Sequence, residues 1–310
     1  MAQLPAPDVA VYTNTQIARE LVLSAKTIEA HLTRIFAKMQ NDHRRSQAEV
    51  RVTARSPRVR LDHDGDGVAV VTFDSPPDNL YDEVMHDQLS SVIADFQAVP
   101  PRAVLFRAEG RMVSAGVDVN FFHTSPPRTL VQQLVAVTSA VESLPCPTVF
   151  AAHGLCLTWA FELALGCDLI LASDRASFGL VERVIGLTPI MGGTQRLAER
   201  AGIGRAKQMV LTGDLFSART LERWNVVNQV LSSSSFDQQV RRIVSSMAEG
   251  PPRAHAATKQ VLARYRVAGV AGADEDLPSI AAALFDTHDF QDAVRSFLRH
   301  GPGHAVFTGD

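Results

Sequence analysis

Two glutamates lie in the most apolar parts of this 310-residue chain. Glu162 stands within GLCLTWAFELALGCDLILAS, residues 154–173, and Glu182 stands within ASFGLVERVIGLTPIMGGTQ, residues 176–195. Burial in apolar surroundings raises the pKa of a carboxyl group towards neutrality, where the group can act as a general acid or base. We therefore predict that this pair carries acid–base chemistry. The alternative is that each glutamate is a structural carboxylate paired with a basic or backbone group.

Two loops of small residues accompany these glutamates. RMVSAGVDVN, residues 111–120, follows a predicted strand, and its small side chains would let a ligand approach the backbone closely. HGLCLTWAFE, residues 153–162, offers Thr158 as the predicted N-cap of a helix that starts near Trp159. The first N–H groups of a helix have no intrahelical partner and lie at the positive end of its dipole. Such a site suits a developing oxyanion.

The elements that must position these groups alternate along the chain. The expected order is a β-hairpin at 59–77, a helix at 81–96, a strand at 102–110, a helix at 129–144, and strands at 147–153 and 169–173. This alternation predicts an α/β architecture with covered sheets. The strand pattern is lost after residue 250, and helices are expected at 252–266 and 277–298.

Composition is that of an ordinary globular protein, with 46% hydrophobic and 20% charged residues, and the net charge of −3 argues against a polyelectrolyte-binding chain. The charge is uneven, because residues 1–60 carry +5 and the remainder −8, which suggests two parts with different partners. No basic-then-apolar signal opens the chain. A membrane span in 147–172 is not expected, because three polar residues and two glycines interrupt it. We expect a cytoplasmic protein.

No metal site is expected. The cysteines Cys146, Cys156 and Cys167 are odd in number, fit no metal-binding spacing and are predicted to be reduced, buried thiols. Asp62, at the start of DHDGDG, begins a calcium-loop-like pattern. The twelfth position of that pattern is Phe73 rather than a glutamate, so we predict a hairpin turn.

The segment 1–56 is predicted to be a helical extension. TNTQIARELVLSAKTIEAHLTRIFAKM, residues 13–39, has the helix, tight turn and basic helix of a helix-turn-helix, and it resembles part of the DNA-binding module of LuxR-type regulators. The resemblance would give base contacts to the second helix, at Lys26, Thr27, Glu29, Ala30 and Arg34. The first helix of that module is missing from PAPDVAVY, residues 5–12, so DNA binding is not the expected role.

Six motifs of the remaining chain, taken in order, resemble the crotonase superfamily of enoyl-CoA hydratases and isomerases. They are SPPDNLYDEV, SAGVD, FELALGCDLILASDRASFGLVE, GLTPIMGGTQRL, VLTGDLFSA and AVRSFL. The resemblance implies a crotonase-fold core, a spiral of ββα units, over 57–250. It also implies that helices in 251–310 contribute to oligomer contacts and to the CoA pocket. Members of this superfamily usually form trimers or dimers of trimers, so the resemblance implies that this chain forms a homotrimer or hexamer.

The resemblance also implies a mechanism on an acyl-CoA thioester. Backbone N–H groups of Val117 and Trp159 would hold the thioester oxygen as it becomes an enolate. Glu162 and Glu182 would act together, one deprotonating water for attack on Cβ and the other giving a proton to Cα. No metal and no cofactor is implied, since coenzyme A belongs to the substrate.

The CoA end is assigned by the same resemblance. The SAGVD motif would contact the nucleotide through Ala115, Gly116 and Asp118, and basic groups near the C-terminus, Arg299 and His300, would meet the phosphates. An ordinary solvated surface is the alternative for the last two.

Two departures from the family pattern bear on the reaction. Trp159 replaces a small residue before the first glutamate, and its bulk would reduce the acyl pocket. Ile190 stands where hydratases often carry glycine. Hydration of a 2-enoyl-CoA remains the main hypothesis, with isomerisation, which can use one glutamate, or another acyl-CoA reaction as alternatives. A different class of alternative is a DNA-binding regulator that senses an acyl-CoA.

Overall fold

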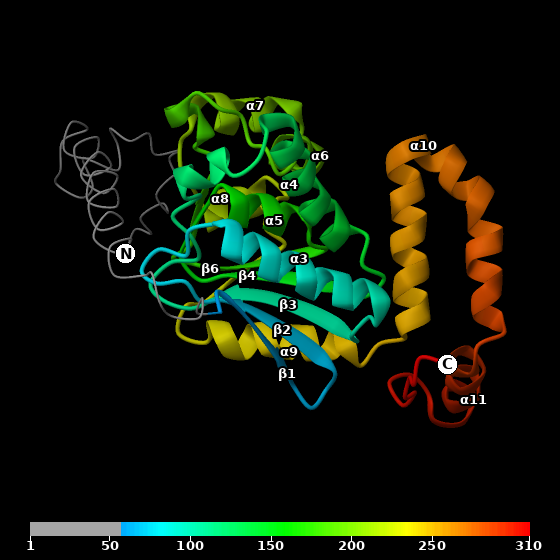
Figure 1. Cartoon of the computed structure of the whole chain (residues 1–310). Helices are drawn as coiled ribbons and strands as arrows, with labels where there is room; N and C mark the ends of the chain where they lie inside the picture. Colours follow the sequence, from blue (N-terminus) through cyan, green and yellow to red (C-terminus); the bar gives the residue numbers. More distant parts are fainter. Residues whose placement is uncertain (1–56) are drawn as a thin grey trace, which may run out of the picture.

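The computed structural model describes residues 57–310, which form an α/β body and a helical C-terminal part (Figure 1). The main sheet has the strand order β1-β2-β3-β4-β6-β9. Its strands are β1 (Val59–His63), β2 (Val68–Phe73), β3 (Ala103–Ala108), β4 (Thr148–Ala152), β6 (Leu169–Ser173) and β9 (Gln229–Leu231). Strands β1 and β2 form the predicted antiparallel hairpin, and all other neighbours are parallel.

The hairpin turn is closed by the side chain of an aspartate. One carboxylate oxygen of Asp64 accepts hydrogen bonds from the N–H groups of Asp66, at 3.2 Å, and Val68, at 2.9 Å. Within residues 57–310 no group of three or more His, Cys, Asp or Glu side chains could hold a metal ion.

Both faces of the main sheet are covered, which explains its nearly continuous apolar strands. Along β2, Ala69, Val71 and Phe73 share one hydrophobic core with α3 (Glu83–Ala98), α4 (Pro127–Glu142) and α5 (Trp159–Gly166). Val68 belongs to a second core on the other face, with α9 (Phe236–Ala248). Figure 1 shows α3 and α9 on opposite sides of the sheet. The alternation follows from the two-residue period of a strand.

A second sheet brings the two chemical segments together. Its strands are β5 (Leu155–Leu157), β7 (Ser177–Gly179) and β8 (Phe216–Ser217). Strands β5 and β7 are parallel, with Leu157 opposite Gly179, so their carboxyl ends meet at one edge. Helix α5 follows β5 directly, and the 3₁₀ helix η2 (Glu182–Ile185) follows β7. Two separate segments thus deliver one glutamate each to the same place.

The remaining elements frame this edge and extend the chain. They are η1 (Val119–His123), α6 (Gly193–Ala201), α7 (Ile203–Thr212), α8 (Ala218–Arg223), α10 (Pro252–Phe285) and α11 (His288–His300). Helix α10 consists of two segments that meet at Gly269, whose backbone is not helical. The helix predicted over 277–298 is divided, because the Thr287 side chain accepts the N–H of Phe290 and starts α11.

The C-terminal helices lie beside the body in Figure 1. They expose large apolar side chains. Val267 is 82% exposed and Leu298 is 79% exposed. Exposed apolar surface of this kind often marks a contact with another protein. The role of 251–310 in oligomer contacts stays a prediction, which this exposed apolar surface supports. The predicted helix-turn-helix lies in 1–56, outside the described residues.

The cysteines Cys146, Cys156 and Cys167 are free and buried, as predicted. No helix within 57–310 is long and apolar enough to cross a membrane.

Candidate active site

A pocket with a volume of about 70 Å³ lies at the carboxyl ends of β5 and β7. Its wall contains six of the predicted site residues, Ala115, Gly116, Val117, Trp159, Glu162 and Glu182. The rest of the wall is largely apolar and includes Tyr81, Phe121, Phe122, Leu134, Val184, Ile185, Leu187, Ile190 and Met191. A small apolar pocket with few polar groups is the usual form of a small-molecule site.

The backbone N–H of Val117 is turned away from its neighbouring segment. A parallel bridge joins Tyr81 to Val117 through two hydrogen bonds, from the Tyr81 N–H to the Gly116 carbonyl at 3.0 Å and from the Asp118 N–H to the Tyr81 carbonyl at 2.9 Å. Because successive N–H groups of an extended chain point in opposite directions, the Val117 N–H points to the other side. It is thus available to a ligand on the pocket wall.

Trp159 provides a second N–H as the first residue of α5, since the first turn of a helix has no intrahelical acceptors for its N–H groups. The preceding residue is not the side-chain cap that the sequence predicts. Thr158 makes no capping hydrogen bond and has φ 47° and ψ −117°. The helix start is fixed by the backbone instead, through a bond from the Thr158 N–H to the Gly179 carbonyl at 3.0 Å.

Glu162 is 2% exposed and is held by a loop about thirty residues further along the chain. One of its carboxylate oxygens accepts the N–H groups of Met191 and Gly193, each at 2.8 Å. Desolvation raises the pKa of Glu162 to about 7, while these hydrogen bonds and the charge of Arg196 limit the rise. The group is therefore able to exchange a proton near neutral pH.

Gly193 is required by this contact. A Cβ atom at this position would lie 2.6 Å from Cγ of Glu162 and 3.0 Å from its hydrogen-bonded oxygen. The glycine lets the loop approach closely enough for its N–H groups to reach the carboxylate. The Gly-Gly turn of the sequence is thus part of the site.

Glu182 faces the same pocket with much less support for its charge than Glu162 has. It is 8% exposed, and neither carboxylate oxygen has a hydrogen-bond partner. Desolvation, followed by the nearby charge of Glu162, raises its pKa to about 8. Two interacting carboxyl groups whose pKa values lie near neutrality can share one proton, so that one acts as acid while the other acts as base.

The indole of Trp159 braces the loop that carries the Val117 N–H. It is fully buried, packs against the rings of Phe73 and Tyr81 and donates its N–H to Ser114 Oγ at 2.6 Å. Ser114 Oγ also accepts the Gly116 N–H at 2.9 Å. The indole therefore packs against the core, while Trp159 also lines the pocket, and a reduction of the acyl pocket by its bulk stays a prediction.

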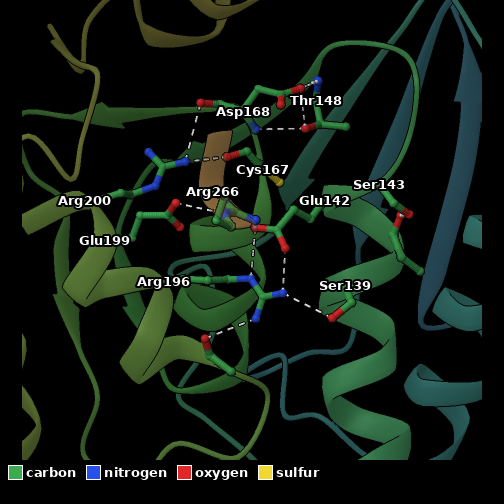
Figure 2. Close-up of polar contacts among 12 residues, drawn as sticks. Ser139, Glu142, Ser143, Thr148, Cys167, Asp168, Arg196, Glu199, Arg200 and Arg266 are labelled. Atoms are coloured by element: carbon green, nitrogen blue, oxygen red, sulfur yellow. Dashed lines mark hydrogen bonds and ion pairs between the residues drawn. The ribbon is translucent and has the colours of Figure 1, made fainter. Parts of the chain in front are cut away.

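A polar network underlies the loop that holds Glu162 (Figure 2). The Arg196 guanidinium donates to the Gly192 carbonyl at 3.2 Å, to Glu142 at 2.8 Å and to Ser139 at 3.2 Å. Arg266 of α10 contacts the other oxygen of Glu142 at 2.7 Å. This network attaches the loop before α6 to the end of α4, and it contributes the positive charge that limits the pKa of Glu162.

Three of the predicted residues do not line the pocket. Asp118 caps η1 by accepting the N–H of Asn120 at 3.0 Å. Arg299 and His300 lie exposed in the last turn of α11. Their assignment to CoA binding stays a prediction.

The sequence assigned no role to the N–H groups of Met191 and Gly193 or to Ser114, and it assigned the hydroxyl of Thr158 a capping role that the structure does not show. The Gly-Gly turn was a usable signal for the first two. Ser114 had none, because its contacts with Trp159 depend on segments that meet only in the folded protein.

The fold and this pocket define a class, that of the crotonase-fold enzymes. The enoyl-CoA hydratase from Mycobacterium smegmatis has a similar structure, with a TM-score of 0.74 and 25% identity over 78% of this chain and 96% of that one. The family model for enoyl-CoA hydratase/isomerase matches residues 63–304. The chain belongs to the enoyl-CoA hydratase/isomerase family.

Relatives agree with this assignment at modest identity. A Bacillus subtilis (strain 168) protein named "Probable enoyl-CoA hydratase" is 26% identical over 237 residues, 74% of this chain and 92% of that protein. The short-chain-enoyl-CoA hydratase of Clostridium acetobutylicum is 32% identical over 158 residues, 51% of this chain and 60% of that protein. The model for bacterial regulatory proteins of the luxR family matches residues 10–50, which confirms the second resemblance.

The brace predicts an energetic coupling between Trp159 and Ser114. Trp159→Phe keeps an aromatic ring but removes the N–H donor, and Ser114→Ala removes its acceptor. We expect each variant to lower the unfolding free energy, with a coupling of about 1 kcal/mol in a double-mutant cycle measured by urea unfolding. Trp224→Phe combined with Ser114→Ala is the control and should show additivity. Additive effects for the Trp159 pair would contradict the brace.

The raised pKa of Glu182 predicts a pH-dependent stability difference. Between its ordinary value of 4.5 and about 8, the folded protein keeps a proton that the unfolded chain has released, so this group makes stability fall as pH rises. Glu182→Gln does not titrate. We expect its melting temperature to exceed that of the wild type by more at pH 8 than at pH 4.5. The control Glu249→Gln, at an exposed position, should give the same melting-temperature difference from the wild type at both pH values. The same result for Glu182→Gln would contradict the raised pKa of Glu182.

Proposed function

We propose that the protein is an enoyl-CoA hydratase that adds water across the double bond of a 2-enoyl-CoA. The observation that carries the proposal is the pairing of Glu162 and Glu182, two buried carboxyl groups with pKa values of about 7 and 8, on one pocket wall. The N–H groups of Val117 and Trp159 on the same wall suit the thioester oxygen. Family membership supplies the acyl-CoA class of substrate.

The proposed reaction divides the elements of water between two carbons. A water oxygen forms a bond to Cβ, and the electron pair of the double bond shifts towards the thioester carbonyl. The thioester oxygen thereby becomes an enolate oxygen, which the N–H groups of Val117 and Trp159 hold. A proton then reaches Cα. The carboxyl pair gives this proton to Cα and takes one proton from water, so the pair holds the same number of protons before and after the reaction.

The environments of the two glutamates assign their roles. Glu162 has two N–H donors and a nearby arginine, which favour its charged form, so it is the base that takes the proton of water. Glu182 has no donor and the higher pKa, so it carries the proton that is delivered to Cα. Preorganised donors of this kind stabilise developing charge with little reorganisation.

The alternatives use fewer of these features. An isomerase needs a single glutamate to move a proton, and the second unsupported carboxyl would then have no role. A regulator that senses an acyl-CoA would draw on the luxR-like residues 10–50 but needs no acid–base pair.

The small volume of the pocket favours a short acyl group, because a cavity that admits benzene measures about 150 Å³.

Removal of either carboxyl group should abolish most of the activity. We expect Glu162→Gln and Glu182→Gln each to lower kcat on but-2-enoyl-CoA by about 10²- to 10⁴-fold, measured as loss of enoyl-thioester absorbance. The double variant should be little worse than either single one, because the two groups act as a unit. Glu249→Gln, at an exposed position, should match the wild type. An active Glu182→Gln variant would instead favour the one-glutamate isomerase.

The pH dependence of kcat/KM should be bell-shaped, with its maximum between about pH 7 and pH 8. Activity falls at lower pH as Glu162 gains a proton and at higher pH as Glu182 loses one. The Arg196→Met variant loses a charge that lowers the pKa of Glu162, so its acid limb should move to higher pH. A flat profile from pH 6 to pH 9 would exclude this acid–base pair.

A further inference from the structure

Thr158 has a backbone conformation that its residue type disfavours. Its φ of 47° lies in the left-handed region, where a β-branched residue is a genuine outlier. Its backbone groups hold it there, since its N–H donates to Gly179 at 3.0 Å and its carbonyl accepts the N–H of Glu162 at 2.8 Å. Such strain gathers at functional sites, where the surrounding structure enforces it.

The hydroxyl of Thr158 makes no hydrogen bond within the described residues in this conformation. The side chain is 7% exposed, its Oγ1 atom is buried without a hydrogen-bond partner, and it does not cap α5. A buried hydroxyl without a partner is unfavourable. A ligand that provided an acceptor would remove this penalty.

The position of the hydroxyl is between the two segments that present N–H groups to the pocket. It lies 3.3 Å from where a Cβ of Gly116 would be, so it lies over the loop that leads to Val117. It also belongs to the residue directly before Trp159. All four residues line the pocket.

A second buried hydroxyl shows that a structural role is not enough to explain this one. Thr138 Oγ1 also has no partner, but Thr138 lies in the interior of α4 with its methyl group against Gly166, away from the pocket. Thr138 is explained by packing alone. Thr158 combines the missing partner with pocket lining and with a disfavoured backbone.

We propose that the Thr158 hydroxyl is a third hydrogen-bond donor to the thioester oxygen, beside the N–H groups of Val117 and Trp159. The inference rests on the proposed acyl-CoA function and adds a catalytic residue to it. The donor strengthens as the oxygen gains negative charge, so its contribution is larger in the enolate than in the bound substrate. No proton is transferred by the hydroxyl.

The test compares Thr158→Val with Thr158→Ser and with the matched control Thr138→Val. The valine keeps the branched shape, and the serine restores the hydroxyl. With but-2-enoyl-CoA we expect Thr158→Val to lower kcat by about 10- to 100-fold with little change in KM. Thr158→Ser should recover most of this loss, and Thr138→Val should match the wild type. Circular dichroism and melting temperature confirm that each variant is folded.

A binding measurement separates this inference from the hydratase proposal. Butyryl-CoA labelled with ¹³C at the thioester carbonyl cannot be hydrated, and the infrared stretch of its carbonyl reports hydrogen bonding directly. We expect a shift to lower frequency on wild-type binding, a smaller shift with Thr158→Val and the full shift with Thr158→Ser and Thr138→Val.

The outcomes are distinct. A wild-type carbonyl shift that depends on Thr158, without turnover of any 2-enoyl-CoA, would overturn the hydratase proposal and keep the inference. Turnover with kcat and carbonyl frequency unchanged in folded Thr158→Val would overturn the inference alone. Failure of the wild type to bind butyryl-CoA would overturn both.

Discussion

Desolvation of two carboxyl groups is the interaction on which the rest of the site depends. The packing of α5 and η2 against the core removes Glu162 and Glu182 from water. Because water stabilises the charged form, its loss raises both pKa values above the ordinary 4.5. The fold compensates one of them and not the other. Glu162 receives N–H groups from a distant loop, whereas Glu182 receives none, and this asymmetry distinguishes two residues of identical chemistry.

The edge of the small sheet also positions the backbone N–H donors of the pocket. The small sheet aligns the ends of β5 and β7, α5 begins where β5 ends, and the bridge between Tyr81 and Val117 turns one N–H towards the pocket. Ser114 and the indole of Trp159 then hold the two segments together. The large side chain of Trp159 is therefore accommodated by a buried structural contact.

Much of the fold was predictable because its elements have simple periodicities. The hairpin, the strands at 103–108, 148–152 and 169–173 and helices α3 and α4 agree with the predicted order, since alternating or 3.6-residue patterns reflect which faces are buried. Helices were also expected after residue 250, but α10 continues through residues 267–276, where none was predicted, and the break at Thr287 was not predicted either. A capping threonine signals a helix start only weakly when apolar residues continue on both sides.

The sequence by itself determined that two carboxyl groups would be buried and that small-residue turns would stand before helices, because apolar context and glycine are local properties. It also determined family membership, through motifs in a fixed order. Only the tertiary structure decided which N–H groups reach Glu162, where the indole of Trp159 lies and that the Thr158 hydroxyl has no partner. These depend on contacts between segments up to 45 residues apart, whose distances and directions are set when the two sheets pack.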